Sequence, residues 1–498
     1  MNALLVLPVI LPFTVAAVTL WPGENQGGQH GISILGAFLH LAACAMLFIR
    51  VVQSGMQAMQ VGDWPAPFGI TLVADHLSVV MVLVTAILGF AVTLYSRADI
   101  DSDLLTAGYH PLLHILLGGV CGAFLTGDLF NLYVWFEVML MASFGLIVLG
   151  RKEEQFDGGV KYVMINLFAT LLFISGIGLL YGMTGTLNLA DLHLAVQEVE
   201  NQALLTAVAA IFMTAFGIKA GLFPLFFWLP VSYHTPPAAV SAILAGLLTK
   251  VGVYALIRLF TLVFIFDVAY THGVLLVGAI VTMFTGVLGA AAYNEFRRIL
   301  SYHIISQVGY MVLGLALFSP LALAGAVFYL LHHMIVKANL FLVSGLSARM
   351  CGTFELKKLG GLYRNNWFVA LLFFIPAFSL AGFPPLSGFW AKLILVRAGL
   401  EIGAYGAAAA AVIVGLLTTY SMTKIWGEAF WKPSPELDAE QSRQMGGSDI
   451  WMLLPISGLA CLTLIIGLLP GPFLEVAEQA AHELTHPEIY VNAVLGGS

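Results

Sequence analysis

The chain has 498 residues, of which 60% are hydrophobic and only 9% are charged. Soluble domains carry about 25% charged residues, so this composition indicates an integral membrane protein built as one large helical bundle. The formal net charge of −7 excludes the basic surface of a nucleic-acid-binding protein. The four cysteines (Cys44, Cys121, Cys351 and Cys461) are isolated in or beside apolar runs and lack metal-site spacing. We therefore expect no metal and no cofactor.

Hydropathy predicts about fourteen membrane-spanning helices, since each needs roughly 20 mostly apolar residues. The first begins with Met1-Asn2-Ala3-Leu4, which lacks the positive start of a signal peptide, so we expect it to be retained. The predicted segments are 3–20, 31–52, 75–96, 111–127, 129–150, 159–183, 203–230, 238–260, 271–292, 301–318, 321–348, 366–400, 402–428 and 450–472, with breaks inside 203–230 and 366–400. The predicted fold is an all-α polytopic membrane bundle.

Lysine and arginine concentrate in alternate connections of this bundle. The connections after the third, fifth, ninth, eleventh and thirteenth helices contain Arg97, Arg151, Lys152, Arg297, Arg298, Arg349, Lys357, Lys358, Arg364, Lys432 and Arg443. The connection 184–202, after an even-numbered helix, contains acidic residues and no basic one. Because cytoplasmic loops are enriched in basic residues, we predict a bacterial inner (cytoplasmic) membrane with both termini on the outer, periplasmic side.

The segment 211–250 is mostly apolar but combines charged residues with helix breakers. It contains Lys219 and Lys250, and its prolines are Pro224, Pro236 and Pro237. Ionisable residues at bilayer depth are costly and usually functional. Interrupted helices in membrane proteins mark ion or substrate sites. The pattern therefore indicates an ion site at a broken helix.

A weak internal repeat relates the two predicted broken helices, because residues 220–228 (AGLFPLFFW) resemble residues 381–390 (AGFPPLSGFW). They lie five helices apart, and an odd offset reverses direction across the membrane, so we expect two inverted repeats made of helices four to eight and nine to thirteen. The expected division of the chain is 1–110 for the first three helices, 111–260 and 261–430 for the two repeats, and 431–498 for a cytoplasmic loop, the last helix and an acidic tail.

Seven titratable side chains lie well inside apolar segments: Glu137, Lys219, Lys250, His332, His333, Lys337 and Lys392. An unpaired buried charge is destabilising, so Lys219 is the expected partner of Glu137. Burial disfavours a charged lysine, whereas a nearby carboxylate favours it. Movement of Glu137 relative to Lys219 would therefore load or release a proton. The alternative is a static ion pair that only holds two helices together.

The remaining candidates extend this pair into a relay. Lys250 is either the next proton carrier or a lysine whose ammonium group reaches the membrane interface. His333 and Lys337 are four residues apart and share one helix face, and histidine titrates near neutral pH. His332 is either the relay histidine or a hydrogen-bonded interior residue. Lys392 is predicted to be the terminal, exit lysine because it lies beside the second break, as Lys219 lies beside the first.

Two other patterns point elsewhere. His482-Glu483-Leu484-Thr485-His486 matches the HExxH pattern of zinc proteases. It lies beyond the last predicted membrane helix, and we interpret it as a short amphipathic helix on the outer surface. The many glycines form no nucleotide-binding pattern; Gly118, Gly119, Gly122 and Gly127 are expected to permit close helix packing.

The titratable residues and their surroundings resemble the antiporter-like subunit family shared by respiratory complex I, membrane-bound hydrogenases and Mrp-type cation/proton antiporters. The resemblance is strongest over residues 110–425 and covers essentially the whole chain. The matching stretches are Trp135-Phe136-Glu137, 219–224, 234–237 with Lys250, 298–302, 307–310, 333–342, and 382–385 with Lys392. It implies proton translocation through Glu137, Lys219, Lys250, His333, Lys337 and Lys392.

Within this family, the length of the chain and the lysine at position 392 favour the D branch of the Mrp-type antiporters. That branch implies a transporter subunit rather than an enzyme. It implies a hetero-oligomer with the Mrp A, C and other subunits in the lipid bilayer, which exchanges Na⁺ for protons and is driven by proton motive force. The rival hypothesis is a proton-pumping subunit of complex I or a membrane-bound hydrogenase. A third is a scaffold in which the buried charges only fix helix register.

Overall fold

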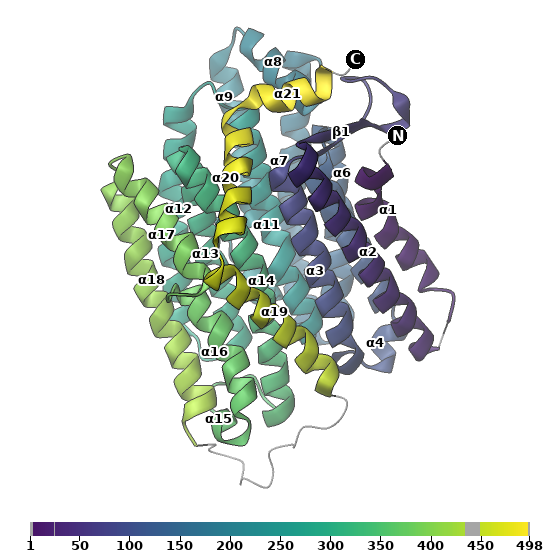
Figure 1. Ribbon diagram of the computed structural model, residues 1–498, viewed down its shortest axis with the longest axis vertical. Coiled ribbons are helices and arrows are strands. Elements are labelled where there is room, and N and C mark those ends of the chain that lie inside the picture. The colour runs from purple at the N-terminus through teal and green to yellow at the C-terminus, as the bar shows by residue number, and fades with distance from the viewer. Residues whose placement is uncertain (1–2, 24, 434–448, 497–498) are drawn as a thin grey trace.

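The computed structural model describes residues 3–23, 25–433 and 449–496 (Figure 1). The predicted start at Met1 and the part of the basic loop that contains Arg443 lie outside the described residues. The helices of the first half are α1 (Ala3–Val18), α2 (Gln26–Ser54), α3 (His76–Asp99), α4 (Ser102–Thr106), α5 (Tyr109–Leu125), α6 (Leu129–Val148), α7 (Glu153–Thr184), α8 (Leu189–Ala195), α9 (Gln202–Ala220), α10 (Trp228–Ser232) and α11 (Ala238–Leu262).

The helices of the second half are α12 (Val268–Ala292), α13 (Phe296–Leu317), α14 (Pro320–Cys351), α15 (Leu362–Asn365), α16 (Trp367–Ala381), α17 (Ser387–Glu401), α18 (Tyr405–Ile425), α19 (Ile450–Leu468), α20 (Gly471–Thr485) and α21 (Pro487–Leu495). Two 3₁₀ turns, η1 (Val61–Asp63) and η2 (Val196–Glu198), and a π-helical turn, η3 (Trp426–Trp431), complete the helical elements. Strands β1 (Gln57–Gln60) and β2 (Thr71–Ala74) form an antiparallel hairpin between α2 and α3, which was not predicted from the sequence.

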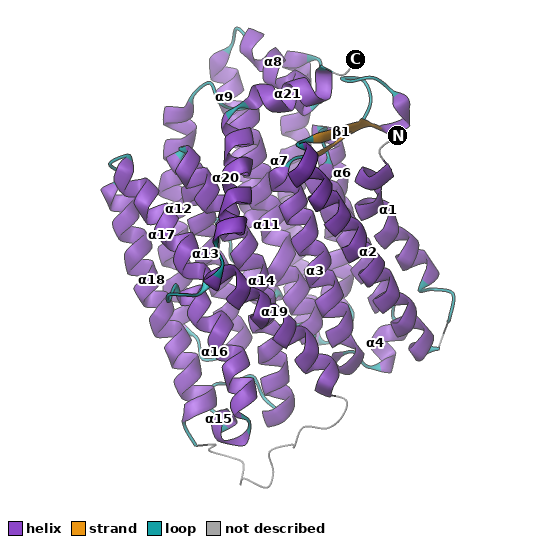
Figure 2. Cartoon of the chain, viewed as in Figure 1, coloured by secondary structure: helices purple, strands orange, loops and turns teal. Residues whose placement is uncertain are grey.

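The bundle is nearly all helical, as predicted, and Figure 2 shows helices throughout. Eleven of the described helices are long and apolar enough to cross a membrane, and α1, α5 and α16 are shorter apolar helices. Each of the predicted segments overlaps one of these fourteen helices, although fourteen crossings stay a prediction. The structure therefore confirms a polytopic α-helical membrane protein.

Three helices form the centre of the bundle. Every residue of α11 is buried, and α13 and α14 are buried along almost their whole length. By contrast, α2, α7 and α12 bury only one side and leave apolar side chains exposed on the other, as expected for helices that face lipid. Titratable side chains in the middle of these three helices, such as Lys250 and Lys337, are therefore enclosed by protein.

The two predicted breaks have the same local structure. Helix α9 ends at Gly221 (φ 82°), and α16 ends at Gly382 (φ 97°). Left-handed backbone favours glycine, which explains why both breaks contain it. In each, the residue after the glycine donates its amide to the carbonyl four residues before the glycine: Leu222 to Gly217, and Phe383 to Phe378. This supports the predicted repeat, whose exact boundaries stay a prediction.

The C-terminal region differs from the prediction. Helix α19 ends at Leu468, short of the predicted 472, and α20 then packs against α14 and α3 instead of lying as a free helix on the outer surface (Figure 1). Small apolar side chains at helical spacing, Ala477, Ala480 and Ala481, allow this close contact. Hydropathy alone did not predict this packing, because the charged residues on the opposite face lower the mean hydropathy of the segment.

We expect Glu483 to hold α20 against the start of α3. Its carboxylate accepts hydrogen bonds from the His76 amide (2.9 Å) and His76 Nδ1 (2.8 Å). Glu483→Ala leaves a buried amide unsatisfied, so we expect about 1–3 kcal/mol lower stability. Thermal unfolding of the purified protein measures this, with Glu478→Ala on the exposed face as the matched control. Equal unfolding temperatures for the two variants would contradict the expected role.

Candidate functional site

Glu137 and Lys219 are joined through a third residue. Thr170 on α7 donates its hydroxyl to Glu137 Oε1 on α6 (2.6 Å) and accepts a hydrogen bond from Lys219 Nζ on α9 (3.3 Å). The ammonium also lies 4.8 Å from the centre of the Phe136 ring. The predicted direct ion pair is therefore replaced by a carboxylate–hydroxyl–ammonium chain. Thr170 could not be singled out beforehand, because single threonines are common in apolar helices.

A small cavity lies beside Lys219. Its volume is about 20 Å³, and its lining includes Tyr162, Asn166 and Trp228. A water molecule needs roughly 10–15 Å³ of such space and two or more polar partners, so the cavity has room for one. Lys219 is thus in contact with a hydroxyl on one side and a hydratable space on the other.

Helix α11 approaches the end of α9 closely at this point. A Cβ on Gly252 would lie 2.6 Å from the Ala220 nitrogen and 2.9 Å from the Lys219 carbonyl carbon. Trp228 Nε1 donates to the Ile218 carbonyl (3.1 Å), which also accepts from the Gly221 amide at the end of α9. This packing brings α11, and with it Lys250, next to the Lys219 break.

Lys250 is fully buried, and its ammonium group donates to the Ala245 carbonyl of the same helix. Its ammonium group therefore does not reach the membrane interface, which was the alternative interpretation of this lysine. His333 and Lys337, both fully buried on α14, face it: Lys250 acts electrostatically on both. The structure thus places these three predicted residues together.

His303 on α13 is an additional member that was not predicted from the sequence. It is fully buried and interacts electrostatically with Lys337 and Lys392. The sequence did contain an indication of it, because His303 lies inside the predicted membrane segment 301–318, as His332 lies inside the next one. Within the described residues, neither ring nitrogen of His303 or His333 has a hydrogen-bonding protein partner, and nor does Lys337 Nζ. These groups form the centre of the candidate site.

The second helix break holds His332 and Lys392. His332 Nδ1 lies 2.8 Å from Ser387 Oγ, which in turn lies 2.9 Å from Ser379 Oγ. Lys392 Nζ donates to the carbonyls of Leu380 (2.9 Å) and Ala381 (3.0 Å), which α16 leaves free where it ends. Alignment of the two glycine caps makes Leu380 the counterpart of Lys219. The ammonium of Lys392 therefore lies at the position that corresponds to Lys219.

The histidine doublet is divided between two surroundings. His332 points to the second break, whereas His333 faces the central lysines. Tyr329 links the two regions: its ring lies 5.8 Å from His332, 6.4 Å from His333 and 5.2 Å from Tyr310. Lys392 Nζ is 5.1 Å from the Tyr310 ring centre. The rings of Tyr329 and Tyr310 thus link the two histidines to Lys392.

Two open cavities of about 500 and 620 Å³ lie at the end of the bundle that carries Arg97, Arg151 and Arg297, which we call the basic-loop face. Arg297 lines both of them. Its Nη1 donates to the Pro236 carbonyl (2.6 Å), just before α11 begins. Its guanidinium also lies over the Phe354 ring at 3.7 Å. Arg297 therefore holds the turn between α10 and α11 at the basic-loop face.

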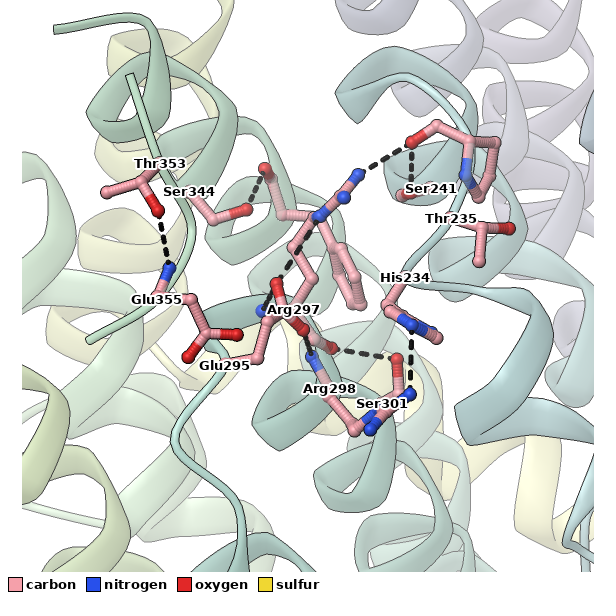
Figure 3. Close-up of polar contacts among 12 residues, drawn as sticks. His234, Thr235, Ser241, Glu295, Arg297, Arg298, Ser301, Ser344, Thr353 and Glu355 are labelled. Carbon is pink, nitrogen blue, oxygen red and sulfur yellow. Dashed lines mark hydrogen bonds and ion pairs between the residues drawn. The ribbon is translucent and has the colours of Figure 1, made fainter. Parts of the chain in front are cut away.

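His234 lies beside this arginine pair. Arg298 Nη2 is 3.2 Å from His234 Nε2 (Figure 3). Burial, together with the charges of Arg298 and Arg297, lowers the pKa of His234 to about 4. The ring is therefore neutral near pH 7, and its Nε2 accepts the hydrogen bond from the guanidinium. Glu295 caps α13 by accepting from the amides of Arg297 (3.1 Å) and Arg298 (2.6 Å), and burial raises the pKa of its carboxyl.

The HExxH pattern is occupied by structural contacts. Glu483 binds His76, and the rings of His482 and His486 stack on each other at 4.2 Å on the exposed side of α20. Within the described ranges, no group of three or more His, Cys, Asp or Glu side chains could hold a metal ion. The pattern thus anchors a helix in this protein.

The chain is similar to known proteins over its whole length. The sequence profile described as NADH:quinone oxidoreductase/Mrp antiporter, TM matches residues 126–418. The D subunit of the Na(+)/H(+) antiporter of Alkalihalophilus pseudofirmus is 46% identical over 99% of this chain and 100% of its own length. A chain in the structure of the Mrp complex from Dietzia sp. DQ12-45-1b is 34% identical, with a TM-score of 0.92 and full coverage of both chains. A chain of respiratory complex I from Thermus thermophilus (24% identity, TM-score 0.84, 97% of this chain and 99% of that chain) shares the fold.

Gly252 is expected to be essential for the contact between α11 and α9. Gly252→Ala forces a Cβ against backbone atoms, and overpacking of this kind costs about 1–3 kcal/mol. Gly178→Ala on α7, where a Cβ meets nothing within 4 Å, is the matched control and gains the same helix propensity. Thermal unfolding of both variants tests this. The expectation fails if Gly252→Ala is as stable as Gly178→Ala.

His234 makes the stability depend on pH in a defined window. Its pKa falls from 6.5 in the unfolded chain to about 4 in the folded protein, so the unfolded state binds the proton more readily. Stability is therefore lost as the pH falls from about 6.5 to about 4. We expect His234→Gln to reduce the drop in unfolding temperature between pH 7 and pH 5. An identical drop in the variant and the wild type would refute this assignment.

Proposed function

Because this chain belongs to the NADH:quinone oxidoreductase/Mrp antiporter family, we propose that it is the proton-translocating subunit of a multisubunit Na⁺/H⁺ antiporter that is driven by proton motive force. The 46% identity to the D subunit of a Na(+)/H(+) antiporter over nearly the whole chain supports this assignment. It is a secondary transporter subunit and not an enzyme. In this proposal, a sibling site exports Na⁺ or another monovalent cation while this subunit conducts the protons.

One observation carries the proposal: buried titratable side chains form a row through the bundle. The row runs from α6 and α9 through α11 and α14 to α17, and its members are Glu137, Lys219, Lys250, His333, Lys337, His303, His332 and Lys392. The central members are fully buried. Ionisable groups at such depth are retained in membrane proteins mainly where ions or protons pass.

Thr170 is the proposed switch at the first end. Its hydroxyl has one proton and two lone pairs, so it donates to Glu137 while it accepts from Lys219. The carboxylate favours the charged ammonium through this bridge, whereas burial disfavours it. When Glu137 moves away, Lys219 releases its proton towards Lys250 or the adjacent cavity. When Glu137 returns, Lys219 is loaded again.

The central residues pass the proton onward. Buried polar groups require a hydrogen-bonding partner, and the side chains of His303, His333 and Lys337 have none in the described protein. Transient water between them supplies these partners and carries the proton. Lys392 then holds it at the free carbonyls of the second break. Adjacent basic groups in the row do not stay charged together for long, because like charges repel one another.

The proposed setting is the cytoplasmic membrane of a bacterium, with the basic-loop face in the cytoplasm and both termini outside. The partners are the other Mrp-type subunits, including A and C, in a hetero-oligomer. The likeness to a complex I chain shows the fold alone and leaves the redox-complex hypothesis as a rival. Copurification separates the two, because a redox complex would contain quinone- or nickel–iron-binding subunits.

We expect Thr170→Val to reduce Na⁺/H⁺ exchange at least about tenfold, because valine keeps the shape but removes the hydroxyl bridge, and tenfold corresponds to roughly 1.4 kcal/mol. Thr170→Ser, which keeps the hydroxyl, is the matched control. Lys219→Ala and Glu137→Ala are expected to abolish exchange. Exchange is measured in everted membrane vesicles, and assembly is checked by copurification of the partner subunits.

Full exchange in assembled Lys219→Ala and Glu137→Ala complexes would refute the relay. The scaffold hypothesis and the relay predict different results for Lys392 at the second helix break. The scaffold hypothesis predicts that Lys392→Ala changes stability but leaves the transport rate of the surviving complexes unaltered, whereas the relay predicts loss of exchange at unchanged assembly.

A further inference from the structure

Four buried histidines lie together in the N-terminal helices, outside the matched residues 126–418 and outside the relay. His30 and His40 belong to α2, and His110 and His114 belong to α5. All four side chains are buried, with at most 7% of any residue exposed. We call these four residues the histidine column.

The column is joined by direct contacts. His110 Nε2 lies 3.1 Å from His30 Nδ1, with the two rings edge to face at 4.8 Å. One helical turn further along α5, His114 Nε2 lies 2.8 Å from Ser33 Oγ. His40 is the next group, and it interacts electrostatically with His114. The distance along α2 from His30 to His40 is about 15 Å at 1.5 Å per residue.

The column is closed at one end, which holds His40. His40 Nε2 donates to the Pro8 carbonyl (3.1 Å), which is free because Pro12 has no N–H to bond it within α1. Cys121 Sγ lies 3.6 Å from the same nitrogen, and Cys44 adjoins Cys121. The next turns of α2 and α5 present apolar side chains, among them Leu47. The column is therefore not a passage across the membrane.

The end of the column that holds His30 and His110 opens at the basic-loop face. A cavity of about 290 Å³ there is lined by Gln29, Gly108 and Pro111, the neighbours of His30 and His110. One cation, Arg97 on α3, acts on His30. Helix α1 contributes no titratable side chain.

The remaining ionisable groups nearby do not neutralise a charge in the column. The Tyr109 ring lies 5.2 Å from that of His110, and the Asp99 carboxylate, which acts electrostatically on Tyr109, accepts a hydrogen bond from the Ala239 amide (2.8 Å). A proton on the column therefore has a like-charged neighbour, Arg97, and no carboxylate among the described contacts to balance it. Imidazole nitrogens bind and release protons, so the ligand that these four contacting histidines fit is the proton.

Helix α5 connects the column to the relay. Its opposite side meets α6 around Glu137: a Cβ on Gly122 would lie 2.4 Å from the Trp135 ring, and one on Gly119 would lie 3.1 Å from the Met139 side chain. Contacts this close leave no free space, so a displacement of α5 must also displace the turn of α6 that carries Glu137.

We propose that the histidine column is a second proton-binding site, filled from the basic-loop face, which slows antiport when it is occupied. The neutral column is compatible with the packing that holds Glu137 against Thr170. A proton on it is repelled by Arg97, moves α5 and disturbs that contact. Exchange therefore falls as the basic-loop side becomes acidic. The effect on antiport rests on the proposed function, whereas the proton binding does not.

The pH dependence of exchange in everted vesicles, where the basic-loop face is outside, tests this. We expect His110→Gln and His114→Gln to retain exchange at acidic pH where the wild type has lost at least half of its activity, with alkaline rates within about twofold of wild type. Ser33→Ala, which keeps every histidine, should show a smaller shift in the same direction. His272→Gln on α12, a buried histidine outside both sites, is the control and should follow the wild type. Superimposable profiles for all variants would overturn the proposal.

Proton binding itself is measured by infrared difference spectra of the imidazole bands after a pH step, in the complex that carries Lys219→Ala. We expect a histidine signal that persists without transport and disappears when His110→Gln is added. If the glutamine variant fails to assemble, Ser33→Ala is measured in its place, and we expect it to shift the histidine bands. No column-dependent signal would overturn the proposal, whatever the outcome for exchange.

Discussion

The structure depends on the burial of several basic side chains that have few carboxylates to balance them. Lys250, Lys337 and three histidines lie in the interior, and the nearest acidic member of the row is Glu137 at its far end. Such groups can be retained only if they are kept mostly neutral and are shielded from lipid. The fully buried helices α11, α13 and α14 supply that shield, and the lipid-facing helices around them supply the hydrophobic exterior.

The broken helices solve a second problem, which is to provide polar groups at bilayer depth. Where α9 and α16 end, their last carbonyls lack intrahelical partners. Trp228 satisfies one at the first break, and the Lys392 ammonium occupies two at the second. Close packing at Gly252 and Gly388 then brings the neighbouring helix to the break: a Cβ on Gly388 would lie 1.9 Å from the Ser379 carbonyl oxygen. Each break thus presents polar backbone groups inside the bundle and is also a point of close helix packing.

Much of this could be predicted from the sequence, because the physics of the bilayer limits the choices. Apolar length indicated the spans, and the charged residues within them indicated Lys219, Lys250, His333, Lys337 and Lys392. Contacts that depend on orientation could not be predicted. Thr170 was missed because single threonines are common in apolar helices. The packing of α20 was missed because average hydropathy does not show that its alanines lie on one face. The direct pair of Glu137 and Lys219 was a reasonable expectation that ignored the third helix between them.

Lys337 offers the sharpest test of whether protons cross through the buried row, because it lies at the centre, without a protein partner for its ammonium among the described residues. The measurement is Na⁺-dependent proton movement by the purified complex in proteoliposomes that carry Lys337→Met. Lys161→Met, which removes an exposed lysine paired with Asp157, is the control. We predict that Lys337→Met abolishes proton movement while the complex remains assembled and the control retains the wild-type rate. A wild-type rate in the assembled Lys337→Met complex would show that protons do not pass through this row.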